Sequence, residues 1–101
     1  MNRWPESVRA HQDVVTQTVG EDLILLNLKT GVYWGLNRSG AFIWEELSRL
    51  HSPRQTLASL RTRYAADESE LKSALTQLLE QLLHSGLLIA DGAPGPKGRQ
   101  R

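Results

Sequence analysis

The chain has 101 residues, of which 40% are hydrophobic and 23% are charged, and its formal net charge is +1. This length and balance predict one small globular domain, and they exclude a strongly basic field that would attract nucleic acid or anionic membranes in bulk. The absence of cysteine excludes disulfides, thiolate metal sites and cysteine nucleophiles, and the longest aliphatic run, Leu23 to Leu26, is too short for a membrane span.

Residues 1–13 show no helical or strand period, and we interpret them as an N-terminal arm that is either loose or docked through Trp4. Trp4-Pro5 predicts extended backbone, because proline disfavours helix at the residue before it. The arm lacks the apolar segment of a signal peptide, which favours a soluble, cytoplasmic protein.

Three strands are predicted next. β-Branched residues fill 14–19, apolar residues fill 22–28 almost throughout, and 32–36 alternates between two faces. The apolar run of 22–28 is typical of a central strand covered on both faces. If the strand order follows the sequence, the third strand, 32–36, lies at an edge of the sheet.

Glycine marks both connections between these strands. Gly20-Glu21 suits a two-residue type II′ turn. The loop 29–31 ends on Gly31, at the position of a three-residue hairpin that needs a positive φ. Both turns predict an antiparallel meander.

Three helices follow, and each has a start signal. Asn37, Ser52 and Asp67 are placed to cap the first turn of a helix with a side-chain oxygen. Pro53 fits the first position of the second helix. Apolar residues recur at helical spacing after each cap, most clearly after the third, and Gly86 ends the last helix.

These elements predict an α+β fold, with a three-stranded antiparallel sheet packed on a three-helix bundle, similar to a winged helix-turn-helix. We place this domain at residues 14–90. Leu87-Leu88-Ile89 fit a short strand or an extended strap near its end. Residues 91–101 are basic and rich in glycine and proline, and we interpret them as a disordered tail.

No cluster of residues favours catalysis or a metal site. His11, His51 and His84 lie on different predicted elements without metal-ligand spacing. Ser39 and Ser52 lie at helix starts rather than in a nucleophile elbow. We therefore expect a protein that is not an enzyme and that has no cofactor and no metal.

A winged-helix nucleic-acid binder is one alternative. The third helix, which would enter the major groove, carries several acidic residues against a single Lys72, and such a surface repels phosphates. The second helix is more basic, with Arg54, Arg61 and Arg63, and this keeps the alternative open.

The edge strand is the other candidate site. Val32, Tyr33 and Trp34 give it apolar and aromatic surface without a charge or proline that would hinder pairing, and Gly35 allows close backbone approach. An extended peptide would pair there as an added strand. The alternative is that Tyr33 and Trp34 are core residues and that a helix or a second subunit covers the edge.

The stretch 31–37, Gly-Val-Tyr-Trp-Gly-Leu-Asn, is followed by Ile43-Trp44 and resembles the signature of the PqqD-like family. Members of this family are leader-peptide recognition elements of ribosomal peptide natural-product pathways. The leucine-rich helix that leads into Gly86 is similar too, so the resemblance covers roughly residues 14–89. Within the family, the chain is most similar to the stand-alone recognition protein of lasso-peptide clusters. The relative that serves a radical SAM enzyme in pyrroloquinoline quinone synthesis is the nearest alternative.

The resemblance implies a non-catalytic protein that binds the leader of a precursor peptide as an added antiparallel strand. The leader would pair with the third strand, and its side chains would enter a groove between that strand and the third helix. The implied peptide-binding residues are Val32, Tyr33, Trp34, Gly35, Leu71, Ala74, Leu75 and Leu78. The implied partners are the leader, a transglutaminase-like leader peptidase and a cyclase resembling asparagine synthetase.

Overall fold

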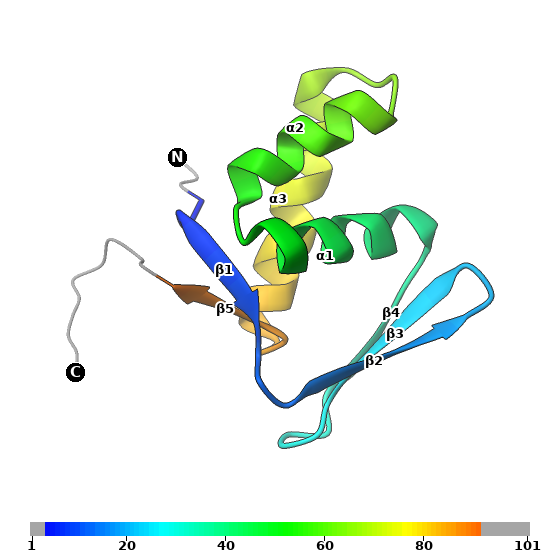
Figure 1. Cartoon of the computed structure of the whole chain (residues 1–101), viewed down its shortest axis with the longest axis vertical. Coiled ribbons are helices and arrows are strands. Elements are labelled where there is room, and N and C mark those ends of the chain that lie inside the picture. Colours follow the sequence, from blue (N-terminus) through cyan, green and yellow to red (C-terminus); the bar gives the residue numbers. More distant parts are fainter. Residues whose placement is uncertain (1–3, 92–101) are drawn as a thin grey trace.

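A computed structural model describes residues 4–91, and within this range the chain has three helices and five strands (Figure 1). Their order is β1 (Ser7–Ala10), β2 (Val14–Val19), β3 (Asp22–Asn27), β4 (Tyr33–Leu36), α1 (Arg38–Leu50), α2 (Pro53–Arg63), α3 (Glu68–His84) and β5 (Leu88–Asp91). The predicted disordered tail lies outside the described residues, apart from its first residue, which ends β5.

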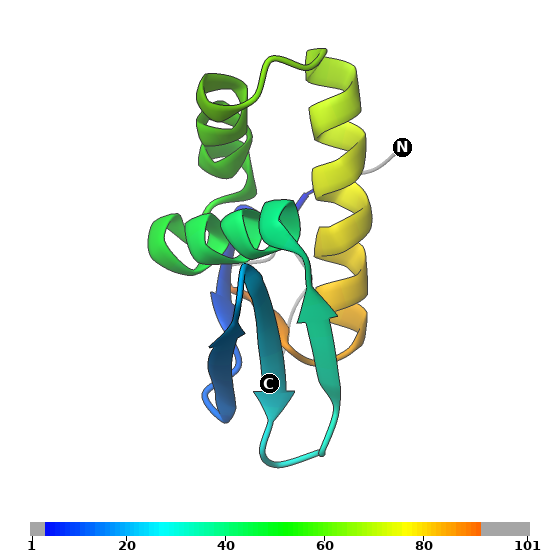
Figure 2. The same ribbon diagram turned by 90° about the vertical axis from the view of Figure 1, so that its right-hand side faces the viewer.

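β2, β3 and β4 form an antiparallel sheet in sequential order, which confirms the predicted meander and places β3 at its centre. Val19 pairs with Asp22, so the first turn is Gly20-Glu21. Gly20 has a φ of +65° and Glu21 has no positive φ, as a type II′ turn requires. Figure 2 shows β4 as the strand of this sheet nearest to α3.

One face of this sheet is buried and the other is not. Leu23 and Leu25 are 5% and 0% exposed, whereas Ile24 and Leu26, which alternate with them along β3, are partly exposed. The prediction that both faces of the central strand are covered is therefore wrong. The helices lie on one side of the sheet, where α1 packs against β3 and β4 (Figure 1). The outer side carries Tyr33, which is exposed to solvent.

Two of the three predicted helix caps form hydrogen bonds. Asn37 and Ser52 accept backbone N–H groups of the first turns of α1 and α2 at 3.0 and 3.1 Å. Asp67 lies at the cap position of α3, but its side chain accepts no N–H there. Glu68 and Glu70 place negative charge in the first turn of α3, which stabilises the helix through its dipole.

The N-terminal arm is folded rather than loose. β1 pairs with β5, with Ser7 opposite Asp91, and Val8 is fully buried. The Trp4 Nε1–H donates to Thr76 Oγ1 of α3 at 2.9 Å, so docking through Trp4 is the arrangement observed. Residues 7–10 therefore belong to the folded part of the chain. The segment after Gly86, for which a short strand or an extended strap was predicted, contains the strand β5.

Leucine side chains form most of the core between the helices and the two sheets. Seven of them are at most 1% exposed, namely Leu25, Leu47, Leu75, Leu79, Leu82, Leu87 and Leu88. Complete burial of one such side chain contributes about 1.5–3 kcal/mol before cavity effects are counted. Three of these seven belong to α3, which packs against α2 and β5.

Candidate functional site

In the part of the chain that the structure describes, β4 pairs with β3 and its other side is an open edge. This confirms the edge position predicted for the third strand. Trp34 and Leu36 turn toward the helices, and Leu36 is 5% exposed. Tyr33, which is 70% exposed, and Gly35 turn toward solvent on the outer face. Trp34 packs against the core and Tyr33 does not, so the two aromatic residues belong to different surfaces.

The hydrogen-bond phase of the β3–β4 pair determines which backbone groups of this edge are free. The Asn27 N–H donates to the Val32 C=O at 2.9 Å, so these two residues face each other as a hydrogen-bonded pair. Such pairs alternate with non-hydrogen-bonded pairs in an antiparallel ladder, and the next hydrogen-bonded residue of β4 is therefore Trp34. It follows that the N–H and C=O groups of Tyr33 and Gly35 point away from β3, into the open edge.

Val32 precedes β4, and its backbone groups are already bonded. Its N–H donates to the hydroxyl of Thr30 at 3.2 Å, and its C=O accepts from Asn27. The hairpin loop therefore occupies the amide of Val32, one of the implied peptide-binding residues, and this N–H is not free for an added strand. The side chain of Val32 is partly buried and is what this residue still offers to the site.

The four α3 residues of the predicted site divide between the core and the helix flank. Leu71 and Leu75 are 8% and 0% exposed and belong to the core. Ala74 is exposed and Leu78 is partly exposed, and their spacing of four residues places them on the same flank. Of the four residues, only Ala74 and Leu78 are therefore accessible on the surface of α3.

This flank faces away from the N-terminal arm. Thr76, which accepts the Trp4 hydrogen bond, lies two residues from both Ala74 and Leu78 and so on the other side of the helix. Figure 1 shows the arm on one side of α3 and β4 on the other. We call residues Tyr33 to Gly35 with Ala74 and Leu78 the β4–α3 margin.

Asn27 holds the β3–β4 hairpin to the end of α3, a role that the sequence analysis missed. The residue is 1% exposed, and its Nδ2 donates to the Gly86 C=O at 3.1 Å. Its Oδ1 accepts the N–H groups of Lys29 and Thr30 at 2.8 and 3.2 Å, so the buried amide is satisfied at both ends. The sequence feature that could have indicated this role is an asparagine at an inward-facing position of a mostly apolar strand.

Two hollows lie outside this margin. One of about 1090 Å³ lies between the arm, α2 and α3, and Trp4, Arg54 and Lys72 are among its lining residues. The other, of about 350 Å³, is lined by Asn37, Arg38, Ser39, Arg63 and Tyr64. Neither includes a residue of β4, so the groove predicted between the third strand and the third helix is not one of these hollows.

The titratable groups of the described residues include surface ion pairs but no candidate metal site. No three His, Asp or Glu side chains among residues 4–91 are grouped so that they could hold a metal ion. The pKa of Glu46 is lowered from its ordinary value because the Arg49 guanidinium hydrogen-bonds to its carboxylate at 2.7 Å. This is an i,i+3 pair on the surface of α1, not an acid–base pair in a cleft. None of the three described helices has the length and apolar composition that crossing a bilayer requires.

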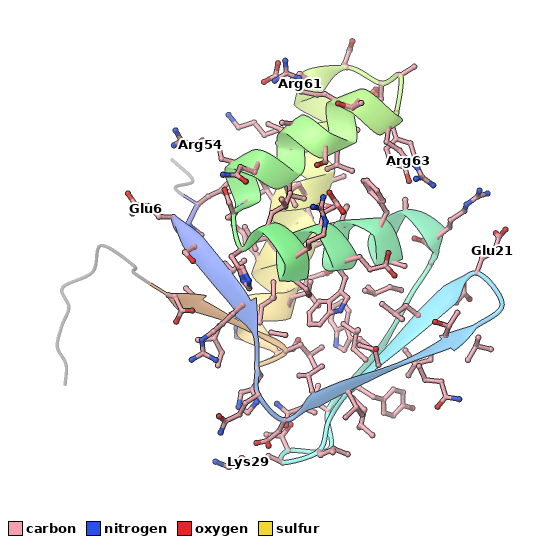
Figure 3. All side chains as sticks on the ribbon, in the orientation of Figure 1. Glu6, Glu21, Lys29, Arg54, Arg61 and Arg63 are labelled. Carbon is pink, nitrogen blue, oxygen red and sulfur yellow. The ribbon has the colours of Figure 1, made fainter. Side chains whose placement is uncertain are left out.

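The arginines of α2 do not form one basic face. Figure 3 shows Arg54, Arg61 and Arg63 at different sides of the helices. Arg61 lies 3.9 Å from Glu68, and the Arg63 guanidinium lies over the ring of Phe42 at 4.8 Å. The nucleic-acid alternative therefore has no continuous basic surface on α2 to support it.

The chain is similar to a known family and to solved structures. Residues 22–88 match the family model described as coenzyme PQQ synthesis protein D (PqqD). The structure of TbiB1 in complex with the TbiA(beta) leader peptide is 26% identical, covers 83% of this chain and 98% of that chain, and has a TM-score of 0.76. The structure of a lasso peptide synthetase B1 complexed with the leader peptide is 23% identical, covers 82% and 98% of the two chains, and has a TM-score of 0.73. No curated protein sequence matches this chain.

Proposed function

The chain belongs to the PqqD family, and from this membership we propose that it is a leader-peptide recognition protein of lasso-peptide biosynthesis. It binds the leader segment of a ribosomally made precursor peptide and catalyses no step itself. The similarity to two leader-peptide complexes, one of them from a lasso peptide synthetase, supports this proposal.

The free backbone of β4 is the observation that carries the proposal. The N–H and C=O groups of Tyr33 and Gly35 face an open edge, where a leader segment can bind as a further antiparallel strand. Each backbone hydrogen bond contributes about 0.5–1.5 kcal/mol net. These hydrogen bonds give affinity for any extended peptide, but they discriminate little between peptides of different sequence.

Selectivity then depends on the apolar side chains of the β4–α3 margin. Every second side chain of an added strand would turn toward the helices, and we propose that it contacts Trp34, Ala74 and Leu78, which are at least partly accessible. A leader that orders on binding loses conformational entropy, so it needs at least one buried apolar anchor. Such an anchor contributes about 1.5–3 kcal/mol when its side chain is fully buried.

We also propose the partners that the bound leader would meet. The protein presents the leader to a transglutaminase-like leader peptidase, and a cyclase resembling asparagine synthetase then closes the ring. The description of the matched family model favours a second candidate, a peptide chaperone of pyrroloquinoline quinone synthesis. The neighbouring genes distinguish these two candidate functions. The lasso pathway needs a short open reading frame for the precursor peptide beside the genes for a peptidase and a cyclase.

The leader segment of the precursor peptide is expected to bind to the protein when the core segment is absent. The experiment is isothermal titration calorimetry with two synthetic peptides, which cover the leader and the core of the precursor encoded beside the gene. Binding of the leader alone agrees with the proposal, because the margin recognises an extended segment and not the product. Equal affinities for the two peptides would overturn it.

A further inference from the structure

The hollow at the start of α1 lies where an added strand would begin. β4 ends at Leu36, and the next residue, Asn37, lines this hollow. An antiparallel strand runs opposite to β4, so its N-terminal end lies beside Leu36. The residues at the beginning of a bound leader are therefore directed toward the hollow and not toward the β3–β4 hairpin loop.

Arg63 is held in this hollow by aromatic stacking. Its guanidinium carbon lies 4.8 Å from the ring centroid of Phe42 and 5.9 Å from that of Tyr64, and the two rings meet edge to face at 6.0 Å. No salt bridge joins Arg63 to a carboxylate among residues 4–91. Stacking orders the guanidinium plane and leaves the N–H donors at its edge available to a ligand.

Arg38 is a second cation of the hollow, and its existing partner is weak. Its Nη1 lies 3.8 Å from Glu21 Oε2, and the two side chains are 70% and 71% exposed. Exposed pairs of this kind contribute little to stability, so another carboxylate can replace Glu21 at small cost. Figure 3 shows Glu21 and Arg63 on the right-hand side of the view.

We propose that Arg38 and Arg63 bind an acidic side chain near the N-terminal end of the leader and so set the register of the added strand. This inference rests on the proposed function. Backbone pairing alone would allow the added strand to shift by two residues along β4, because after such a shift each side chain of the leader still faces the same side of the sheet. A carboxylate held by arginine N–H donors restricts the slip, since a displaced strand would lose a charge-assisted contact.

Selection from a display library of random peptides tests this inference. The three proteins compared are the parent, Arg63→Glu, and the control Arg61→Glu, which makes the same charge change on the same helix outside the hollow. Peptides selected by the parent and by the control are expected to carry Asp or Glu toward their N-terminal ends. Peptides selected by Arg63→Glu are expected to lose this preference and to gain Lys or Arg there.

One peptide selected by the parent then gives the size of the effect. Its affinity is expected to fall about fivefold for Arg63→Glu and to be unchanged for Arg61→Glu, and replacing the acidic residue of the peptide by Lys is expected to recover part of the loss. If the selected peptides depend on the β4 edge but show no charge preference, the inference is overturned and the proposed function stands. If Gly35→Pro leaves the affinity of all selected peptides unchanged, the proposed function itself is overturned.

Discussion

Replacing Gly35 by proline is expected to weaken leader binding by at least about tenfold while the protein stays folded. The substitution removes an N–H group that faces the open edge and places the proline ring where the leader backbone would run. The β3–β4 ladder remains intact, because the Gly35 N–H is not bonded to β3. Trp34 already has the extended backbone that a residue before proline prefers. Calorimetry measures the affinity, and circular dichroism during heating measures the fold.

Gly35→Ala is the matched control. A Cβ at this position lies 3.5 Å from Ile24 Cδ1, an ordinary van der Waals contact, and the alanine keeps its N–H. Leader binding to Gly35→Ala is therefore expected to equal binding to the parent. Tyr33→Pro repeats the test at the first residue of β4, where proline disturbs a strand least. Unchanged leader affinity in both proline variants would show that this edge is not the binding site.

Leu75→Ala is expected to lower the free energy of unfolding by about 2–5 kcal/mol, because the Leu75 side chain is fully buried and its loss leaves a cavity. Leu78→Ala is expected to cost less stability, since Leu78 is only partly buried, and to weaken leader binding instead. Urea unfolding measures the first effect and calorimetry measures the second, under conditions in which both variants are folded.

This pair of variants separates the core of α3 from the wall that a ligand touches. Leu75 and Leu78 both fit the same leucine pattern, so the sequence does not distinguish them. Normal leader binding to Leu78→Ala, together with weak binding to a fully folded Leu75→Ala, would mean that the ligand contacts α3 elsewhere.

The elements that local chemistry controls could be predicted from the sequence. β-Branched residues and a type II′ turn determine the first hairpin, and side-chain caps at Asn37 and Ser52 begin two helices. The edge position of β4 followed from the strand order alone. These features depend on neighbours within a few residues, and the sequence displays such neighbours directly.

The remaining features depend on contacts between distant segments. β1 has four residues and is defined by its pairing with β5, near the other end of the chain. Helical spacing marks an apolar stripe on α3, but only packing shows that Leu75 lies in the core and that Ala74 is exposed. The free backbone groups of β4 depend on the phase of the ladder, which the bond from Asn27 to Val32 reveals.

Hydrogen exchange of single backbone amides, followed by nuclear magnetic resonance with and without the leader peptide, tests the central claim most directly. In the free protein the amides of Tyr33 and Gly35 are expected to exchange fast, and the amide of Trp34 is expected to be protected by β3. Saturation with the leader is expected to slow the exchange at Tyr33 and Gly35. Fast exchange at both of these amides in the saturated complex would contradict strand addition to β4.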